Sequence, residues 1–180
     1  MKDKLLKQAE REHSSKQKVV ALLVEGVFFL DVLPVMLVKL SSWLDQLLHL
    51  STYAFKPIRA VIGWLFIIGG FLFALWSIYV QFTIGKGTPA PVMATQKLIV
   101  QRPYNYCRNP MALGTIILYL GIAILIGSLS AFGLVMLGAI FLLTYIKFIE
   151  EKEMELRFGE DYRQYRQQTP FLIPRLWHRK

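Results

Sequence analysis

The chain has 180 residues, of which 54% are hydrophobic, and it carries a formal net charge of +9 at pH 7. Its charges stand in blocks between long apolar runs, which indicates a membrane protein and argues against an ordinary soluble domain. The single cysteine, Cys107, excludes an internal disulfide and a multi-cysteine zinc site, and we expect no metal. No recognisable nucleic-acid-binding motif accompanies the positive charge, so we expect no nucleic-acid partner.

The first predicted element is an apolar stretch over residues 19–38, which is long enough to cross a bilayer at ~1.5 Å per residue. We interpret the charged segment 1–18 before it as a retained tail, because no cleavage site follows. The stretch contains Glu25, Asp31 and Pro34, which predicts a kinked span packed against its neighbours. An ionised group at a bilayer centre costs ~2.5–3.5 kcal/mol, so both carboxylates are functional candidates. A shallower span with both near an interface is the alternative, and we place neither in a cofactor site.

The next two elements are a mixed segment and a second span. Residues 39–59 combine Trp43 and several leucines with charged residues, which favours an interfacial helix ending before Pro57. Residues 60–82 contain no ionisable side chain apart from a tyrosine phenol, and they predict the second span. A loop rich in glycine and proline, residues 85–91, then leads the chain out of this span.

The apolar run 111–148 is too long for one crossing, and the polar sequence 127–130 breaks it near its middle. Two helices joined by a short turn are therefore predicted. The second helix should continue beyond the membrane through 149–158, which is rich in helix formers, and stop at Gly159. Oppositely charged residues four apart on it can pair, namely Lys147 with Glu151 and Glu153 with Arg157. An extended tail on the membrane interface is predicted from Pro170, Pro174 and Trp177.

The basic residues orient these spans. Lysines and arginines number six before residue 19, three in 39–59, four in 85–110, none in the turn at 127–130, and eight from 147 onward. Because basic segments stay on the cytoplasmic side, we expect both termini and the polar loop to face the cytoplasm. The membrane would be an inner, plasma or endoplasmic-reticulum-type membrane. The fold class is all-α, a polytopic membrane protein with about four transmembrane helices.

The most unusual segment is the polar, basic and aromatic stretch 102–110, which stands directly before the apolar hairpin. Irregular polar backbone beside a span persists only where it is buried in protein or lines a pocket. We therefore expect a pocket at the membrane surface, between this loop and the helix that carries Glu150 and Glu151. The chain would divide into 1–84, with the tail and two spans, and 85–180, with the loop, hairpin, cytoplasmic helix and tail.

Several short motifs follow one another around the hairpin: Gly87-Thr88-Pro89, Leu98-Ile99-Val100, Pro103-Tyr104, Arg108-Asn109-Pro110, Gly114, Glu150-Glu151, Phe158-Gly159 and Tyr162-x-x-Tyr165. In this order and spacing they resemble the isoprenylcysteine carboxyl methyltransferase and phospholipid methyltransferase superfamily of integral membrane enzymes. The resemblance covers residues 85–174, half of the chain. It implies that S-adenosylmethionine binds at the cytoplasmic face, and that a hydrophobic or amphiphilic methyl acceptor enters from the bilayer. Membrane lipids are then the expected partners, and the oligomeric state stays open.

The resemblance also implies roles by position. It gives the cofactor side of the pocket as Ile99, Val100, Tyr104, Tyr106, Asn109 and Pro110. It gives the catalytic residues as Arg108, Glu150 and Glu151, and the two glutamates would also bind the cofactor. Aromatic faces attract a sulfonium cation, and an arginine can hold a carboxylate bidentately. An amine or thiol acceptor would need a base, for which either glutamate is suited, whereas a carboxylate acceptor would need none.

Two departures and two alternative functions accompany this interpretation. Relatives commonly have glycine at the position of Arg102 and an aromatic residue at that of Ala112, so the resemblance bears more on the cofactor half than on the acceptor half. One alternative is an NADPH-dependent membrane steroid or enone reductase, which would need more polar and basic residues than this short loop holds. The other is a non-enzymatic lipid-binding membrane protein, in which the same charges and tyrosines would only anchor helix ends.

Overall fold

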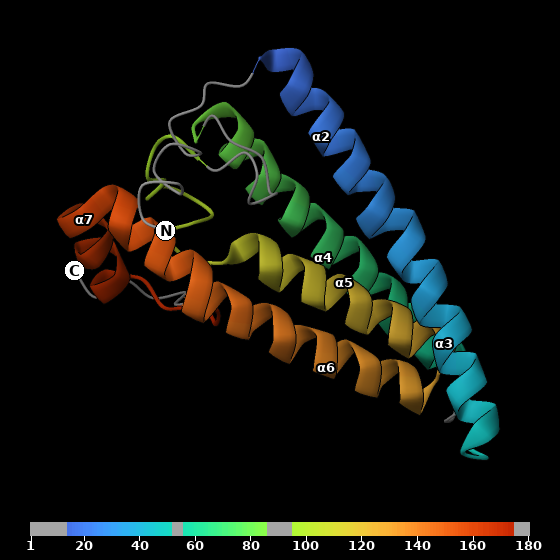
Figure 1. The fold of residues 1–180 in the computed structure, drawn as a ribbon. Coiled ribbons are helices and arrows are strands. Elements are labelled where there is room, and N and C mark those ends of the chain that lie inside the picture. Colours follow the sequence, from blue (N-terminus) through green and yellow to red (C-terminus); the bar gives the residue numbers. More distant parts are fainter. Residues whose placement is uncertain (1–13, 52–55, 86–94, 175–180) are drawn as a thin grey trace. The chain divides into compact units, whose positions relative to one another are not determined.

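The computed structural model describes residues 14–51, 56–85 and 95–174, and all regular structure in these ranges is helical (Figure 1). The predicted all-α class is therefore confirmed. Three of the sequence predictions lie outside the described residues: those on the tail before Ser14, on Gly87-Thr88-Pro89 and on Trp177.

The chain forms six α-helices and two π-helical turns within the described ranges: α2 (Ser15–Val27), η1 (Phe28–Val32), α3 (Leu33–Leu47), α4 (Lys56–Thr83), α5 (Pro110–Ile126), α6 (Leu129–Tyr145), η3 (Ile146–Glu150) and α7 (Glu151–Gln168). Three continuous helical stretches among them are long and apolar enough to cross a membrane, namely Lys16–Leu47, Lys56–Thr83 and Leu129–Gln168. Helix α5 is a shorter apolar helix of 17 residues. In the third stretch the apolar part ends at Ile149, and the charged part begins at Glu150.

The first span is longer than predicted. The helix continues from Ser15 through η1 to Leu47, so residues 39–47 extend it and do not form a separate interfacial helix. That prediction was wrong because no glycine or proline interrupts the helix between Val38 and Leu47. Pro57, which was expected to end a helix, is instead the second residue of α4. A proline is well accommodated there, because its missing N–H has no partner in the first turn.

The π-turn η1 accommodates Pro34 within the first span. A proline ring clashes with the carbonyl four residues earlier in a regular α-helix. Immediately before the proline, the N–H of Leu33 bonds to the carbonyl of Phe28, five residues back, so the turn is widened. The hydroxyl of Tyr119 in α5 donates to the carbonyl of Phe29 at 2.6 Å. The irregularity predicted near the proline is thus a π-turn that is tied to α5.

Helices α4 and α5 run antiparallel with their backbones in close contact (Figure 1). A Cβ atom added at Gly70 would lie 2.5 Å from the nitrogen of Leu118, and one added at Gly114 would lie 2.8 Å from the Gly70 carbonyl. Gly63 and Gly121 repeat this close approach one heptad away, where a Cβ at Gly121 would lie 2.8 Å from the Gly63 carbonyl. Any side chain here would push the helices apart, so their packing depends on glycine.

The predicted hairpin is confirmed, since α5 and α6 are joined by a short turn at Gly127. Gly127 has a φ of +75°, which favours glycine. The first N–H groups of α6 find partners in side chains: Ala131 donates to Ser128 Oγ at 2.9 Å, and Ser130 donates to Asp45 Oδ1 of α3 at 3.2 Å. These two bonds cap α6 and attach α3 to the turn.

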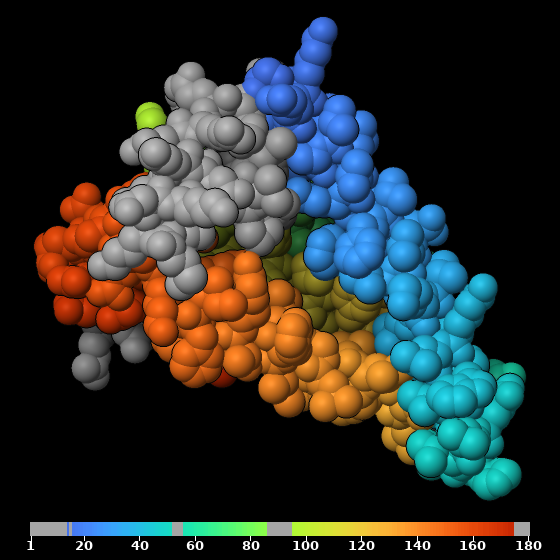
Figure 2. Space-filling model, viewed as in Figure 1, coloured from blue at the N-terminus to red at the C-terminus, as the bar shows by residue number. Residues whose placement is uncertain are grey.

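The outer surfaces of the spans are strongly apolar. On α6, drawn in orange in Figure 2, Phe141 is 77% exposed and Leu137 is 66% exposed. On the first span, Val24 and Leu23 are each 64% exposed. Large apolar side chains exposed to this extent are unfavourable in water but suit contact with lipid chains.

The contacts divide the chain into two compact units. One unit consists of Met1–Glu25, Leu75–Met111 and Tyr145–Lys180, and the other consists of Gly26–Ala74 and Ala112–Thr144. All the predicted site residues belong to the first unit. The division at residue 84 that the sequence suggested stays a prediction.

Candidate functional site

Helix α7 changes direction at Gly159. This glycine has φ +55° and ψ −124°, outside the helical region, so it interrupts the helix as predicted. A second helical piece then continues to Gln168, which the sequence analysis did not predict. This piece carries two buried tyrosines, Tyr162 and Tyr165, and the Tyr165 hydroxyl donates to the carbonyl of Tyr104 at 2.6 Å. The turn at Gly159 thereby brings the end of α7 onto the polar loop.

Arg108 and Glu151 form a buried ion pair between the loop and the start of α7. The guanidinium donates to Glu151 Oε1 from Nε at 2.9 Å and from Nη2 at 2.5 Å. The two side chains are only 8% and 5% exposed. Lys147 donates to the other carboxylate oxygen at 2.8 Å, so the predicted pair four residues apart is confirmed. Both oxygens of Glu151 are therefore occupied by cations of the chain itself.

Arg108 also holds the end of α7 and the segment after it. Its Nη1 donates to the carbonyls of Arg166 at 2.9 Å and Thr169 at 2.6 Å, and its backbone N–H donates to the carbonyl of Pro170 at 2.9 Å. A planar guanidinium is suited to binding several acceptors in fixed directions. Arg108 thus connects the loop to two separate parts of the carboxyl-terminal region.

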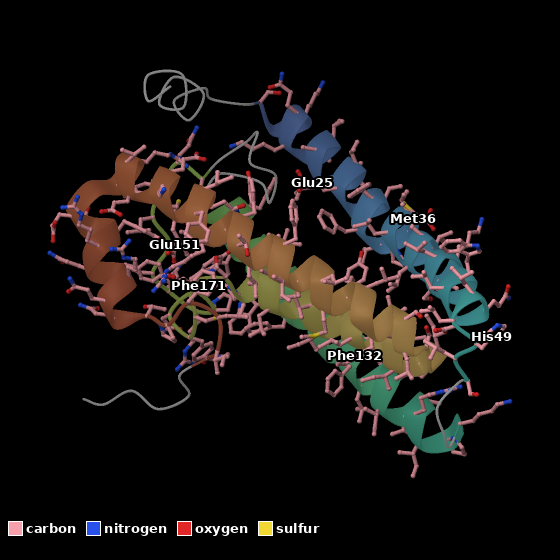
Figure 3. All side chains as sticks on the ribbon, turned by 60° about the horizontal axis from the view of Figure 1, so that its bottom comes forward. Glu25, Met36, His49, Phe132, Glu151 and Phe171 are labelled. Atoms are coloured by element: carbon pink, nitrogen blue, oxygen red, sulfur yellow. The ribbon has the colours of Figure 1, made fainter. Side chains whose placement is uncertain are left out.

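Asn109 and Phe171 extend this connection. The Asn109 amide donates to the carbonyl of Phe171 at 2.9 Å. The Phe171 ring lies 5.7 Å from the Arg108 guanidinium and 5.1 Å from Lys147 Nζ, both within cation–π range. Figure 3 labels Glu151, at the start of α7, and Phe171, in the segment after α7. Thr169 has an extended backbone, and Phe171 after it docks on the Arg108-Asn109 pair. The extended tail on the membrane interface stays a prediction.

Glu150 differs from its neighbour Glu151 because no hydrogen bond or ion pair joins its carboxylate to another described residue. Burial, together with the nearby charge of Glu153, raises the pKa of Glu150 from 4.5 to about 7. Glu153 itself pairs with Arg157 at 3.5 Å, which confirms the second pair predicted from the sequence. The site therefore contains one fully paired carboxylate and one available carboxylate that changes its protonation near neutral pH.

The loop contributes aromatic residues and an unpaired amide oxygen. The Tyr104 hydroxyl donates to Gln81 Oε1 at 3.2 Å, and burial raises the pKa of Tyr104 well above its usual range. The ring of Tyr106 packs edge-on against Trp76 at 6.4 Å. Between the two tyrosines, Asn105 Oδ1 is buried without a hydrogen-bond partner. A buried polar atom of this kind calls for a partner that the described residues do not supply.

Ile99 and Val100 lie in the extended segment that leads into the loop. Ile99 is buried, and its Cδ1 atom lies 2.8 Å from where a Cβ at Gly85 would stand, so it packs against the end of α4. Val100 is 55% exposed and is available for contact with another molecule. Arg157 of α7 donates to the carbonyl of Thr95 at the start of this segment. The segment is thus fixed to α7 at one end by Arg157 and at the other by Arg108.

A family comparison can now be set beside this geometry. The model of the phospholipid methyltransferase family matches residues 58–161, more than half of the 180 residues. The chain belongs to the phospholipid methyltransferase family. Together with its apolar helices, this membership identifies an integral membrane methyltransferase, and it confirms the resemblance found in the motifs. No curated protein and no solved structure matches the chain.

The phospholipid methyltransferase match includes every site residue predicted from the sequence, from Ile99 to Glu151. The structure adds three residues that the sequence analysis did not single out as site residues, namely Asn105, Arg157 and Phe171. Asn105 lies within the polar loop but had been given no role, and Arg157 had been expected only to pair with Glu153. Phe171 follows a proline beyond the matched range, and no local pattern indicates that it meets Arg108.

Proposed function

We propose that this family member transfers a methyl group from S-adenosylmethionine to an amine of an amphiphilic acceptor in the bilayer. The reaction would take place between loop residues 99–110 and the start of α7. The observation that carries the proposal is the available carboxylate of Glu150, which stands beside the fully paired Glu151. Glu151 would therefore hold the loop and α7 together, while Glu150 would take part in the reaction.

The residues of this region fit the proposed cofactor. Asn105 Oδ1 is a buried acceptor without a partner among the described residues, and it suits the ammonium or hydroxyl donors of a nucleoside amino acid. The ring face of Tyr104 suits a cation, and that of Tyr106 already has the Arg102 guanidinium 5.6 Å from its centroid. When bound, S-adenosylmethionine supplies a methyl group on a sulfonium centre. Ile99, Val100, Asn109 and Pro110 would complete the cofactor side.

Arg108 and Glu151 would act by positioning the two walls. Four side-chain hydrogen bonds from Arg108 go to Glu151, Arg166 and Thr169, which leaves little of the guanidinium for a ligand. Methyl transfer by displacement depends on alignment and on the exclusion of water. A rigid connection between the loop and α7 would favour both conditions.

Glu150 would act as the general base. An amine must lose a proton before its lone pair can attack, and a base is most effective when its pKa lies near the working pH. A pKa of about 7 meets this condition. A carboxylate acceptor would need no base, and the ionised form of Glu150 would repel it.

The distribution of basic residues supports a cytoplasmic position for the site. The segment from residue 147 onward holds eight lysines and arginines, and the 127–130 turn holds none. Under the positive-inside rule, the loop, α7 and both termini would face the cytoplasm. The amphiphilic acceptor would then reach the site from the cytoplasmic leaflet.

Calorimetric titration of the purified protein in detergent tests this function. We expect S-adenosylhomocysteine to bind with micromolar affinity and NADPH not to bind. Glu150→Gln should lower methyl transfer to a phospholipid amine at least tenfold, whereas Glu155→Gln, the same change at a partly exposed residue of α7, should leave it unchanged. Binding of NADPH alone would identify a reductase, and binding of neither compound would point to a protein without this enzyme activity.

A further inference from the structure

One carboxylate of the first span, Asp31, has no place in the methyltransferase site and lies deep within an apolar run. Residues 19–38 form this run, and Lys18 and Lys39 bound it. At a rise of ~1.5 Å per residue, Asp31 is about 4 Å along the helix from the centre of the run. Charged side chains at such a depth normally face the interior of a helix bundle and pair with another polar group. The surroundings of Asp31 therefore bear on what the first span contacts.

Asp31 has no polar partner in the part of the chain that the structure describes. Its side chain is exposed, and no hydrogen bond or ion pair joins it to another described residue. Glu25, the other carboxylate of the run, differs because it interacts with another residue of the chain. With no water in the hydrocarbon region, a polar group there has to find its partner in protein. Asp31 therefore calls for a partner from another molecule.

The π-turn η1 holds Asp31 in a defined place on the span. The turn comprises Phe28–Val32, and the Tyr119 hydroxyl of α5 donates to the carbonyl of Phe29 within it at 2.6 Å. Single π-turns inside α-helices are frequently found at functional sites. The backbone that carries the carboxylate is thus fixed by a bond to a second helix.

The helix surface around Asp31 is open to a neighbour. No residue in the most apolar part of the first span is buried, whereas 22% are buried in the corresponding part of each of the other two long spans. Val35 is 46% exposed, and Met36, which Figure 3 labels, is 56% exposed. Membrane helices associate through such surfaces when a polar side chain on one helix finds its partner on the other.

The charge of the partner follows from the charge of Asp31. The apolar runs 19–38, 60–82 and 111–146 contain no lysine or arginine, so this chain offers no basic side chain within them. A second copy inserted in the same direction would bring Asp31 against itself, and like charges repel. A lysine or arginine of a different protein would neutralise the carboxylate and donate hydrogen bonds to it. Charge complementarity therefore favours a basic partner helix.

We propose that Asp31 and the exposed surface around it bind a transmembrane helix of another membrane protein, one that carries a lysine or arginine near the middle of its span. Asp31 belongs to the second compact unit, whereas all the predicted site residues belong to the first. The contact therefore joins the methyltransferase to a partner without using the residues proposed for catalysis.

Energy transfer between the labelled full chain and labelled membrane peptides in phosphatidylcholine vesicles tests the proposal. The probe is a helix of about 20 leucines with one lysine at its centre, and the comparison is the same peptide without the lysine. We expect the wild-type protein to associate at least tenfold more strongly with the lysine peptide. Asp31→Asn should remove this preference, whereas Asp161→Asn, the same change in an exposed residue of α7, should keep it. Equal association of the wild type with both peptides would overturn the proposal, as would an unchanged preference in Asp31→Asn.

Asp31→Leu provides a second variant that should fold, because it removes an exposed carboxylate from a span and should keep or raise the melting temperature. It should bind the two peptides equally, and a retained preference would contradict the contact. Moving the lysine about two turns toward either end of the peptide should also abolish the preference, since the charge then lies at another depth. A preference that is independent of depth would rule out a contact in the middle of the membrane.

Energy transfer between copies of the protein tests the other occupant of this surface. We expect Asp31→Leu to leave any self-association of the chain unchanged. Self-association of the wild type that is lost in Asp31→Leu would assign a second copy to the surface and would overturn the proposed partner.

Discussion

Arg108 donates two hydrogen bonds to a single carboxylate oxygen of Glu151, a residue 43 positions later in the chain. Both side chains are nearly inaccessible to solvent, and the remaining carboxylate oxygen is bound by Lys147. A buried pair of this kind is sensitive to the loss of either partner, since the other charge is then left in a low dielectric. The Arg108–Glu151 pair therefore holds the loop against the start of α7.

The first prediction is that Glu151→Gln destabilises the protein strongly. It leaves the Arg108 guanidinium buried without a counter-charge, a change that typically costs about 3–5 kcal/mol. Thermal unfolding in detergent, followed by tryptophan fluorescence, measures the effect. Glu155→Gln is the matched control on the same helix, because Glu155 pairs with Arg163 and Arg166 at the surface. Equal melting temperatures for the two variants would show that the Arg108 pair does not hold the fold.

How much the sequence could predict is clear from the partners of Arg108. The Lys147–Glu151 and Glu153–Arg157 pairs were predicted, because their spacing of four residues fixes them on one helix face. The carbonyls of Arg166 and Thr169 lie 58 and 61 positions from Arg108, and no local rule relates residues so far apart. They meet only because the chain turns at Gly159.

The membrane spans, too, could be predicted from the sequence only in part. Apolar runs predicted the helices, since a membrane demands about 20 apolar residues for each crossing. The close approach of Gly70 to Gly114 was not predicted, because glycines in a span have many uses and only the partner helix shows which use applies. The different environments of Glu150 and Glu151 were also beyond the sequence, which presents two identical neighbours. Burial and partners separate them.

The second prediction concerns the pH dependence of Glu150. Its pKa in the folded protein is raised to about 7, so the folded state binds more protons than the unfolded state between pH 4.5 and about 7. The stability of the wild-type protein should therefore fall as the pH rises through this window. The Glu150→Gln variant should not show this fall. Melting temperatures of both proteins from pH 5 to pH 8 measure the difference. An identical slope in the variant would assign it to other groups.

The third prediction follows from the same protonation. If Glu150 is the base, kcat/KM should rise with pH and level off above about 7, because the ionised form is the active one. Glu153→Gln should move this rise to lower pH, since the charge of Glu153 contributes to the raised pKa of Glu150. Initial rates at limiting acceptor concentration measure both profiles. A rise that stays in place in Glu153→Gln would argue against Glu150 as the titrating group.

The fourth prediction tests the turn at Gly159. A residue other than glycine is strained at φ +55° and ψ −124°, by about 1–3 kcal/mol. A Cβ at this position would meet no atom within 4 Å, so the loss of stability in Gly159→Ala would come from the backbone alone. Gly138→Ala is the control, because Gly138 lies inside α6 with open space around it. A melting temperature for Gly159→Ala equal to that of the control would contradict the backbone conformation at this turn.

The last prediction uses two adjacent glycines of α4. Gly70 faces α5, where a Cβ would lie 2.6 Å from the Gly114 carbonyl, whereas a Cβ at Gly69 would meet nothing within 4 Å. Gly69→Ala should stabilise α4 by about 0.5–1 kcal/mol, because alanine is the better helix former. Gly70→Ala makes the same gain in helix propensity but must separate two rigid backbones, so its melting temperature should fall below that of the wild type. If both variants melt together, the two helices do not pack through these glycines.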